Sequence, residues 1–196
     1  MKPFFFPALL GALLAACGAQ PVRETLPHDP ERTARIRLFG QNQKPSAMTF
    51  GKDCALGKVS VGGSLGDAFR SFTRSADNES LGIPETETTR QLSQRDGILS
   101  KAFYREFVIP AGSLVNVRAA FIGLTTTLTH YTENMKYETV YQEPSHKTRI
   151  TSFTPEAGKD YEAIGVKEGG KEIVIILEVA ADGSLQPAPS EPSICR

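Results

Sequence analysis

The chain has 196 residues, of which 22 are basic and 22 are acidic, so its formal net charge is zero. A balanced charge without a basic stripe gives no electrostatic footprint for nucleic acid, and it gives no basis for a charge-driven contact with a membrane surface. The length suits one domain that is large enough to bury a hydrophobic core. We therefore expect a single globular domain and no nucleic-acid partner.

The first sixteen residues have the three-part layout of a secretory signal. Lys2 provides a short basic region, an apolar run rich in Phe and Leu extends from Phe4 to Leu14, and two small alanines precede Cys17. The apolar run is shorter than the roughly 20 residues that a permanent membrane-spanning helix needs. We therefore predict that residues 1–16 form a signal peptide.

The sequence Leu14-Ala15-Ala16-Cys17 resembles the lipobox of bacterial prolipoproteins. The resemblance implies that the Cys17 thiol receives a diacylglycerol, that the signal is cut before this residue, and that the new amine is acylated. No other cofactor is expected. Gly18 stands where aspartate would resemble an inner-membrane retention signal, so the implied destination is the outer membrane. Several acyl chains, each contributing about 0.8 kcal/mol per buried methylene, make a stable anchor. The alternative is a plain signal peptide with a chance cysteine.

Residues 17–32 are predicted to form a lipidated tether between this anchor and the folded domain. Pro21, Pro27 and Pro30 interrupt any regular element, and the segment lacks apolar periodicity. The tether would hold the domain off the membrane surface.

An alternation of apolar and polar residues begins at Thr33 and, with one interruption, predicts strands up to residue 181. The expected strands are 33–38, 47–50, 58–61, 104–109, 114–122, 124–131, 137–141, 148–153, 160–166 and 172–179. Many short strands at near-regular spacing predict an antiparallel β-sandwich. The run Ile173–Leu177 is apolar on both faces, so its strand is expected to lie centrally in a sheet.

The interruption, residues 62–101, lacks the strand pattern and is predicted to be a short helical insertion. Ser64 is a good N-cap for a first helix, and Asp67 three residues later makes a variant capping box. The apolar residues of this helix, which share one face, are Leu65, Phe69 and Phe72.

A second helix of the insertion is expected over residues 84–95. Pro84 suits the first helical position, Arg95 suits the carboxyl-terminal end, and Gly97 serves as the stop. The residues between the two helices, 75–82, are predicted to be a polar loop.

Two cysteines remain once Cys17 is assigned to lipid. In an oxidising envelope compartment, Cys54 and Cys195 are expected to form a disulfide that closes a loop of about 140 residues. The chain-entropy model gives such a bond at most about 5 kcal/mol. The alternatives are two free thiols or a bond to another chain. The Pro- and Ser-rich tail, residues 182–196, is expected to reach Cys195 without regular structure.

Two segments of the second half resemble envelope β-sandwich domains of the PEGA type and related lipoproteins. They are Ile109-Pro110-Ala111-Gly112, which precedes one strand, and Phe153–Glu162, which crosses a turn into another. The family has no catalytic motif to carry over. The insertion 62–101 departs from a minimal sandwich of this type and is therefore the most distinctive surface of the chain.

The sequence Gly62-Gly63-Ser64-Leu65-Gly66 matches the Gly-x-Ser-x-Gly elbow of serine hydrolases. A hydrolase would use Ser64 as nucleophile, His130 or His146 as base and Asp96 as the acid. That elbow belongs to a mostly parallel sheet, whereas the strands after residue 101 have an antiparallel pattern. A glycine turn whose serine caps a helix is therefore the preferred interpretation, and we expect no enzyme.

Three other patterns have structural interpretations that we prefer. Ser100-Lys101 suggests a serine–lysine pair, but adjacent residues of a strand point to opposite faces. His28, His130, His146 and Glu133 lack the paired spacing of a zinc site, so no metal is expected. The aromatic residues Tyr131, Tyr137, Tyr141, Phe121 and Phe153 could form a sugar-stacking platform, although packing on one face of a sheet is the preferred interpretation.

The sequence thus predicts a lipid-anchored protein of the bacterial envelope with a non-enzymatic binding or scaffolding role and an envelope protein as partner. The alternatives are an inhibitor or immunity-type lipoprotein that blocks a toxin or a cell-wall enzyme, and the Ser64 hydrolase. The insertion is the expected partner surface, because insertions on rigid sandwiches often carry function. Its candidate residues are Asp77, Asn78, Glu79, Glu85, Arg90 and Arg95. Deleting residues 76–95 is expected to spare the sandwich.

Overall fold

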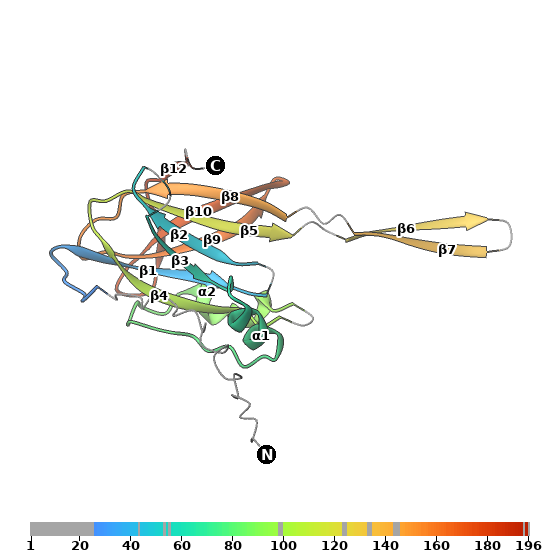
Figure 1. Ribbon diagram of the computed structural model, residues 1–196, viewed down its shortest axis with the longest axis horizontal. Coiled ribbons are helices and arrows are strands. Elements are labelled where there is room, and N and C mark those ends of the chain that lie inside the picture. Colours follow the sequence, from blue (N-terminus) through green and yellow to red (C-terminus); the bar gives the residue numbers. More distant parts are fainter. Residues whose placement is uncertain are drawn as a thin grey trace, which may run out of the picture.

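The computed structural model describes residues 26–196 apart from 43, 53, 55, 98, 99, 123, 124, 133, 134, 143–145, 194 and 196, with side chains described outside 122–146. Two five-stranded sheets pack face to face, and short helices lie along one side of the sandwich (Figure 1). The predicted fold class, a mainly β sandwich with a short helical insertion, is confirmed.

The first sheet has the order β11-β10-β9-β1-β4. Its strands are β1 (Thr33–Gly40), β4 (Phe103–Pro110), β9 (Asp160–Glu168), β10 (Lys171–Val179) and β11 (Leu185–Pro187). Neighbouring strands are antiparallel except for β1 and β9, which run parallel. This parallel pair joins elements more than 100 residues apart, and the local alternation of residues carries no signal for it.

The second sheet has the order β12-β8-β5-β2-β3 and is antiparallel throughout. Its strands are β2 (Ser46–Phe50), β3 (Leu56–Val61), β5 (Val115–Ile122), β8 (His146–Phe153) and β12 (Glu191–Pro192). Between the sheets lies the main core, which is built from alternate residues of both. It includes Ile36, Leu38, Met48, Val61, Val117, Phe153 and Ile176.

The sequence predicted a tail without regular structure, and this prediction is wrong. The tail contributes β11 to the edge of the first sheet and β12 to the edge of the second. Cys195 then forms the expected disulfide with Cys54, and their Cα atoms are 5.8 Å apart. The pattern of alternation was too short to reveal strands of two and three residues, whose pairing is non-local.

The strand β10 is apolar on both faces because each face meets a different cluster. Val174 and Ile176 belong to the main core, whereas Ile175 and Leu177 pack against a second cluster on the outer face of the first sheet. The strand lies between β9 and β11, one position from the edge of its sheet. The outer face is therefore covered, and the insertion provides part of the cover through Leu92.

A buried ionic layer lies beneath this cover. The Arg37 side chain projects from the outer face of β1 and is 1% exposed. Its guanidinium donates to Glu106 Oε1 on β4 at 2.7 and 3.0 Å and to Glu162 Oε2 on β9 at 3.3 Å. Arg37 thus sits between two neutralising carboxylates from the two strands that flank its own.

The same three side chains bind the insertion to the sheet. Arg37 donates to the carbonyl oxygens of Ile83 and Pro84 at 2.9 and 3.0 Å. Glu106 Oε2 accepts hydrogen bonds from the hydroxyl of Ser80 and from two insertion amides, and Glu162 accepts from two threonine hydroxyls. Deleting residues 76–95 would remove all these donors and uncover three buried charges. The deletion is therefore expected to destabilise the sandwich, contrary to the expectation from the sequence.

The insertion contains one regular helix and two shorter turns. The first helix, α1 (Leu65–Phe72), begins where the sequence predicted. In place of one helix over 84–95, the structure has a single turn, α2 (Glu87–Arg90), followed by the 3-10 turn η1 (Leu92–Arg95). Thr86 caps α2 through a capping box with Thr89, so Pro84 lies before the helix, where its carbonyl accepts from Arg37.

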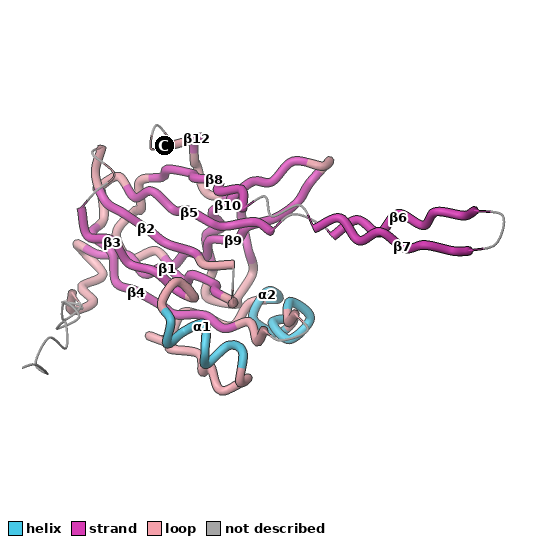
Figure 2. Tube along the Cα trace, turned by 45° about the vertical axis from the view of Figure 1, so that its right-hand side comes forward, coloured by secondary structure: helices cyan, strands magenta, loops and turns pink. Residues whose placement is uncertain are grey.

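The strands β6 (Thr125–Thr132) and β7 (Met135–Gln142) form a separate hairpin, which lies between β5 and β8 in the sequence. Among the described strands, β6 and β7 pair only with each other. Figures 1 and 2 show this hairpin projecting from the end of the sandwich where β5 and β8 meet it. The sequence predicted both strands but not their departure from the body.

Replacing Arg37 with methionine should leave Glu106 and Glu162 buried without their cation. Removing one partner of a buried ion pair costs about 3–5 kcal/mol, so we expect a loss of this size in the free energy of unfolding, measured by urea denaturation. Arg32→Met is the control, because the Arg32 side chain is 82% exposed and its ion pair with Asp29 lies on the surface. Its effect should stay below about 1 kcal/mol. Equal effects would show that the buried layer does not hold the fold.

Candidate functional site

The helix α1 closes one side of the sandwich, where the edge strand β4 of one sheet faces the edge strand β3 of the other. The Ser64 hydroxyl accepts from the Asp67 amide at 3.0 Å and so caps the helix, as the sequence predicted. The Asp67 carboxylate does not complete the box by accepting from the Ser64 backbone amide. It accepts instead from the Gly62 amide at the end of β3 at 3.1 Å.

Asp67 also fastens α1 to the opposite sheet. Its two oxygens accept from the Arg105 guanidinium of β4 at 2.9 and 3.1 Å, and both residues are buried. Burial alone would raise the pKa of Asp67, but Arg105, the Gly62 amide and the Ser64 hydroxyl outweigh it, so the pKa lies below its ordinary value. Asp67 is therefore ionised at neutral pH and links both sheets through one carboxylate.

Ser71, one turn further along α1, makes a second polar attachment. Its hydroxyl donates to the Lys101 carbonyl at 2.7 Å and accepts from the Asn42 amide at 3.0 Å. Ser71 is fully buried. The buried side of α1 is thus its polar side, with Asp67 and Ser71 four residues apart.

The apolar side of α1 faces solvent. Leu65, Phe69 and Phe72 are 92%, 67% and 49% exposed, and we call these three residues the α1 patch. An amphipathic helix on a sandwich ordinarily buries this side. The sequence correctly placed the three residues on one face, but periodicity cannot tell which face is buried. The signal that could have done so is the pairing of Asp67 with the distant Arg105.

The six residues predicted as a partner surface lie on the exterior, but five of them have partners within the domain. Asn78 accepts from the Tyr104 amide, and Glu79 pairs with Arg105. Arg90 pairs with Glu87, and the Arg95 guanidinium lies over the Phe39 ring, 5.7 Å from its centroid. Asp77 and Glu85 are also exposed, and the Asp77 side chain, 93% exposed, lies 4.0 Å from the Lys101 ammonium. Residues 78 and 79 chiefly protect the edge of β4, where Glu79 forms a bridge with Arg105.

The groups of the hydrolase hypothesis have other partners where the structure describes them. Ser64 caps α1, while Asp96 pairs with Arg74 and accepts from the Ala102 amide. His130 lies on the projecting hairpin and His146 at the start of β8, and their side chains are outside the described residues.

The side chains of Ser100 and Lys101, the suggested serine–lysine pair, contact different groups. The Ser100 hydroxyl lies 3.4 Å from that of Ser71, whereas the Lys101 ammonium donates to the Ala76 carbonyl at 2.5 Å. This separation matches the opposite directions of neighbouring side chains.

The candidate metal ligands and the aromatic group are dispersed along the fold. The His28 ring lies 3.2 Å from the Thr33 hydroxyl before β1. Where the chain is described, no three His, Cys, Asp or Glu side chains converge. Phe153 packs edge-on against Tyr161 in the core, whereas Tyr131, Tyr137 and Tyr141 belong to the hairpin. The five aromatic residues therefore do not all lie on one sheet, because the three tyrosines belong to the β6–β7 hairpin, and the tyrosine side chains are outside the described residues.

The two strands of the hairpin pair in an unbroken antiparallel register, from Thr125 opposite Gln142 to Thr132 opposite Met135. All the hydrogen-bonded pairing that the structure describes for β6 and β7 is therefore between these two strands.

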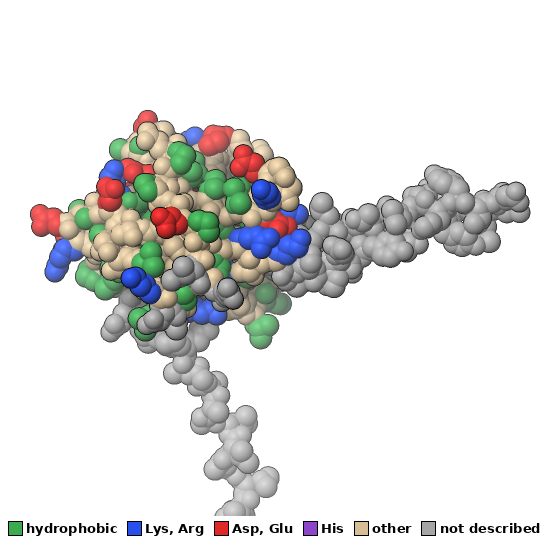
Figure 3. Space-filling view, turned by 90° about the horizontal axis from the view of Figure 1, so that it is seen from above, with side chains coloured by type: hydrophobic (Ala, Val, Ile, Leu, Met, Phe, Trp, Pro, Cys, Tyr) green, Lys and Arg blue, Asp and Glu red, His purple; other side chains and the backbone are tan. Residues whose placement is uncertain are grey.

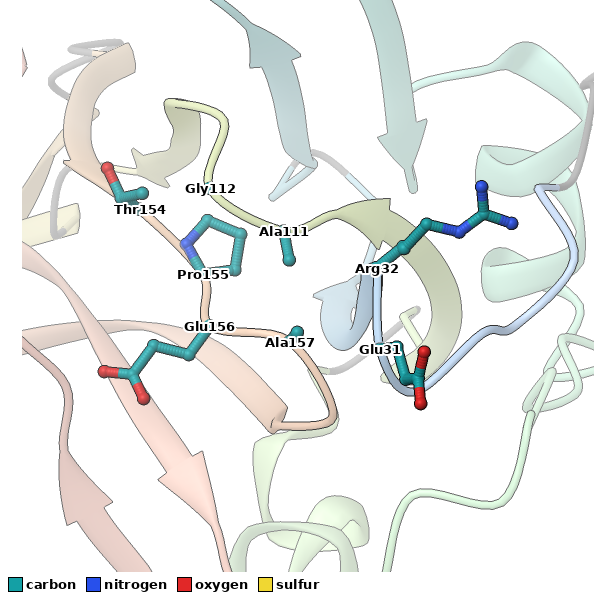
Figure 4. Close-up of a pocket in the computed structure, with 8 residues that line it drawn as sticks. All are labelled: Glu31, Arg32, Ala111, Gly112, Thr154, Pro155, Glu156 and Ala157. Carbon is teal, nitrogen blue, oxygen red and sulfur yellow. The ribbon is translucent and has the colours of Figure 1, made fainter.

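The turn segments 109–112 and 153–162 meet at the end of the sandwich where β1 begins. The Gly112 amide donates to the Pro155 carbonyl at 2.8 Å, and the Gly158 amide donates to the Thr33 carbonyl at 2.9 Å. A hollow of about 570 Å³ lies beside these turns. Figure 4 shows its lining from three loops, with the carboxylates of Glu31 and Glu156 at its border. Small side chains form its floor, and its polar groups do not converge on one point.

Other surface features are diffuse. On the face of the sandwich seen in Figure 3, acidic, basic and hydrophobic side chains are interspersed without a large area of one kind. No helix among the described residues is long and apolar enough to cross a membrane. No family model, curated protein or solved structure matches this chain. The α1 patch and the hairpin are therefore the two surfaces from which a function can be argued.

Replacing Asp67 with asparagine should destabilise the domain by about 3 kcal/mol at neutral pH, because Arg105 loses a buried carboxylate. The pKa of Asp67 is lower in the folded protein than in the unfolded chain. Its contribution is thus fully present above the unfolded value of about 4 and is lost as the pH falls through the folded value. We expect the difference between wild type and Asp67→Asn to be constant from pH 6 to 8 and to shrink below about pH 4.

Urea denaturation across this pH range measures the effect. Glu87→Gln is the matched control, since the Glu87 side chain is 61% exposed and its ion pair is on the surface. It should change stability by less than about 1 kcal/mol at every pH. A difference for Asp67→Asn that stays constant into acid would contradict the assigned role of the ionised carboxylate.

Proposed function

We propose that the chain is a lipid-anchored protein of the bacterial envelope, attached through Cys17, and that it acts by binding another envelope protein rather than by catalysis. The lipobox-like sequence before Cys17 supports the anchor and its expected destination, the outer membrane. The chemistry of the anchor is a diacylglycerol on the thiol and an acyl chain on the amine. The folded domain would then work within a short distance of the membrane.

The observation that carries the binding role is the projecting β6–β7 hairpin. Each strand has eight residues, and neither pairs with another strand of the described chain. A two-stranded hairpin is at best marginally stable alone in water, and the outer edge of each strand presents backbone groups for pairing. A partner that adds a strand to either edge would satisfy these backbone groups. The proposed partner is therefore a protein with an exposed strand.

An inhibitor or immunity-type lipoprotein remains the second candidate. The same hairpin favours it, because a single projecting element can enter the cleft of a toxin or a cell-wall enzyme. A tight complex with one protein would distinguish this role from scaffolding. The Ser64 hydrolase is a third candidate, and labelling of Ser64 by a fluorophosphonate probe on the folded protein would support it.

The hairpin can be removed at a defined point, since Ile122 and His146 are direct cross-strand partners. Replacing residues 123–145 with Asn-Gly would close β5 and β8 with a two-residue turn. We expect this variant to keep its thermal unfolding transition and its place in the membrane fraction, but to lose the partner bands seen after crosslinking in intact cells. Mass spectrometry of the captured material identifies the partner.

Two control variants test the insertion surface and the anchor separately. A variant with Asp77→Lys and Glu85→Lys reverses two exposed charges of the insertion, and it should retain the partner bands. The Cys17→Ser variant should no longer be found in the membrane fraction, and it should remain folded. If the insertion variant loses the partner while the hairpin variant retains it, the partner binds the insertion and the hairpin proposal is wrong.

A further inference from the structure

We propose that the α1 patch inserts into the same lipid surface that holds the chain's own anchor, so that the domain lies on the membrane through Leu65, Phe69 and Phe72. The inference rests on the proposed lipidation of Cys17 and adds a second, non-covalent contact with the lipid. The occupant of the patch is thus a phospholipid surface, not a protein. Three observations support this assignment.

The first is the short length of chain before the domain. Nine residue steps separate Cys17 from Leu26, where the described structure begins. At about 3.3–3.6 Å per residue, the fully extended tether spans only about 30 Å. The strand β1, which is eight residues long, is comparable in length to the extended tether and runs from Thr33, near the tether, to Gly40. Just beyond Gly40, the Asn42 amide donates to the Ser71 hydroxyl of α1. The patch is therefore held within reach of the membrane at a high effective concentration.

The second observation is the chemistry that α1 presents. Its outward face carries two phenylalanines and a leucine, the residue types that interfacial helices place among acyl chains. Its one carboxylate, Asp67, is turned inward against Arg105 and is hidden from the lipid. The exposed charged residues of this segment are Arg70 and Arg74, whose side chains are 55% and 57% exposed. Arginine stems can lie along the apolar surface while their guanidinium groups remain among the headgroups.

The third observation is the small size of the patch together with its fixed orientation. Three side chains of this size cover at most a few hundred Å², whereas a stable protein interface buries about 800 Å² on each partner. A patch this small suits a lipid contact that a covalent anchor assists. Asp67 and Ser71 bind α1 to residues of both sheets, so the apolar side is held outward by buried polar bonds. The three residues of the α1 patch are apolar, so we expect the contact to persist in high salt.

The sequence has no tryptophan, so a single substitution creates a unique reporter. Phe69→Trp places it in the α1 patch. Leu56→Trp is the matched control, since Leu56 is 62% exposed at the first residue of β3, and α1 follows the opposite end of that strand. Each full-length variant is expressed for natural processing, its acyl mass is measured, and it is reconstituted into phosphatidylcholine vesicles with or without bromine on the acyl chains. We expect brominated lipid to reduce the tryptophan emission of the Phe69→Trp variant at least twofold, in low and in high salt. The emission of the Leu56→Trp variant should stay unchanged.

The outcomes separate the lipid contact from the anchor. Acylated protein that floats with the vesicles but shows no quenching at position 69 would overturn the contact and leave the anchor standing. Protein without acyl mass that is still quenched at position 69 but not at position 56 would overturn the anchor and support the contact. Protein that neither carries acyl mass nor is quenched would overturn both. Equal quenching at both positions would also overturn the assigned orientation.

Discussion

Arg37 is the residue on which the arrangement of this protein depends most. Its guanidinium is buried between Glu106 and Glu162 and reaches two carbonyl groups of the insertion. A buried ion pair rarely adds net stability over a well-packed apolar core, but it is costly to break and tolerates little displacement. The buried ionic layer therefore chiefly fixes the position of the insertion on the sheet. It fixes which residues of the insertion lie over β1, β4 and β9, and it makes the insertion part of the domain.

The position of the insertion decides what the sandwich presents to its surroundings. With residues 80–88 bound over the outer face of one sheet, the preceding helix α1 is left at the side of the sandwich between β3 and β4. There Asp67 and Arg105 bury the polar side of the helix, so that its apolar side faces outward. The projecting hairpin leaves the body at the end of β5 and β8. The fold thus separates a surface proposed to contact lipid from an arm proposed to bind protein.

Much of the fold could be predicted from local patterns. Alternation located most of the strands, the N-cap at Ser64 located the start of α1, and counting the cysteines paired Cys54 with Cys195. The parallel pairing of β1 with β9 and the short strands of the tail had no such signal, because they are fixed by contacts across the whole chain. The second helix was predicted too long: Pro84 was expected at its first helical position, but the capping box at Thr86 starts the helix at Glu87, and the 3-10 turn η1 replaces its last part.

The candidate surfaces were harder to predict for the same physical reason. The face of α1 that is buried depends on Arg105, which lies 38 positions away, and a helical period is identical for either orientation. Arg35 and Arg37 alternate with apolar residues and therefore indicate a solvent-facing side of a strand. They are covered instead, because the insertion and the neighbouring strands supply carboxylates and carbonyls in matching positions. Both misleading signals come from polar groups that find buried partners far along the chain.

Native-state hydrogen exchange tests most directly whether the insertion is fixed by this layer. The amides of Leu81 and Ile83 donate to the Glu106 carboxylate and belong to no strand or helix. If the buried layer holds the insertion, these two amides should exchange only through global unfolding, with the same free energy as the Ile36 amide in β1. Rapid exchange of both amides while Ile36 stays protected would show that the insertion opens independently, and the account would be wrong.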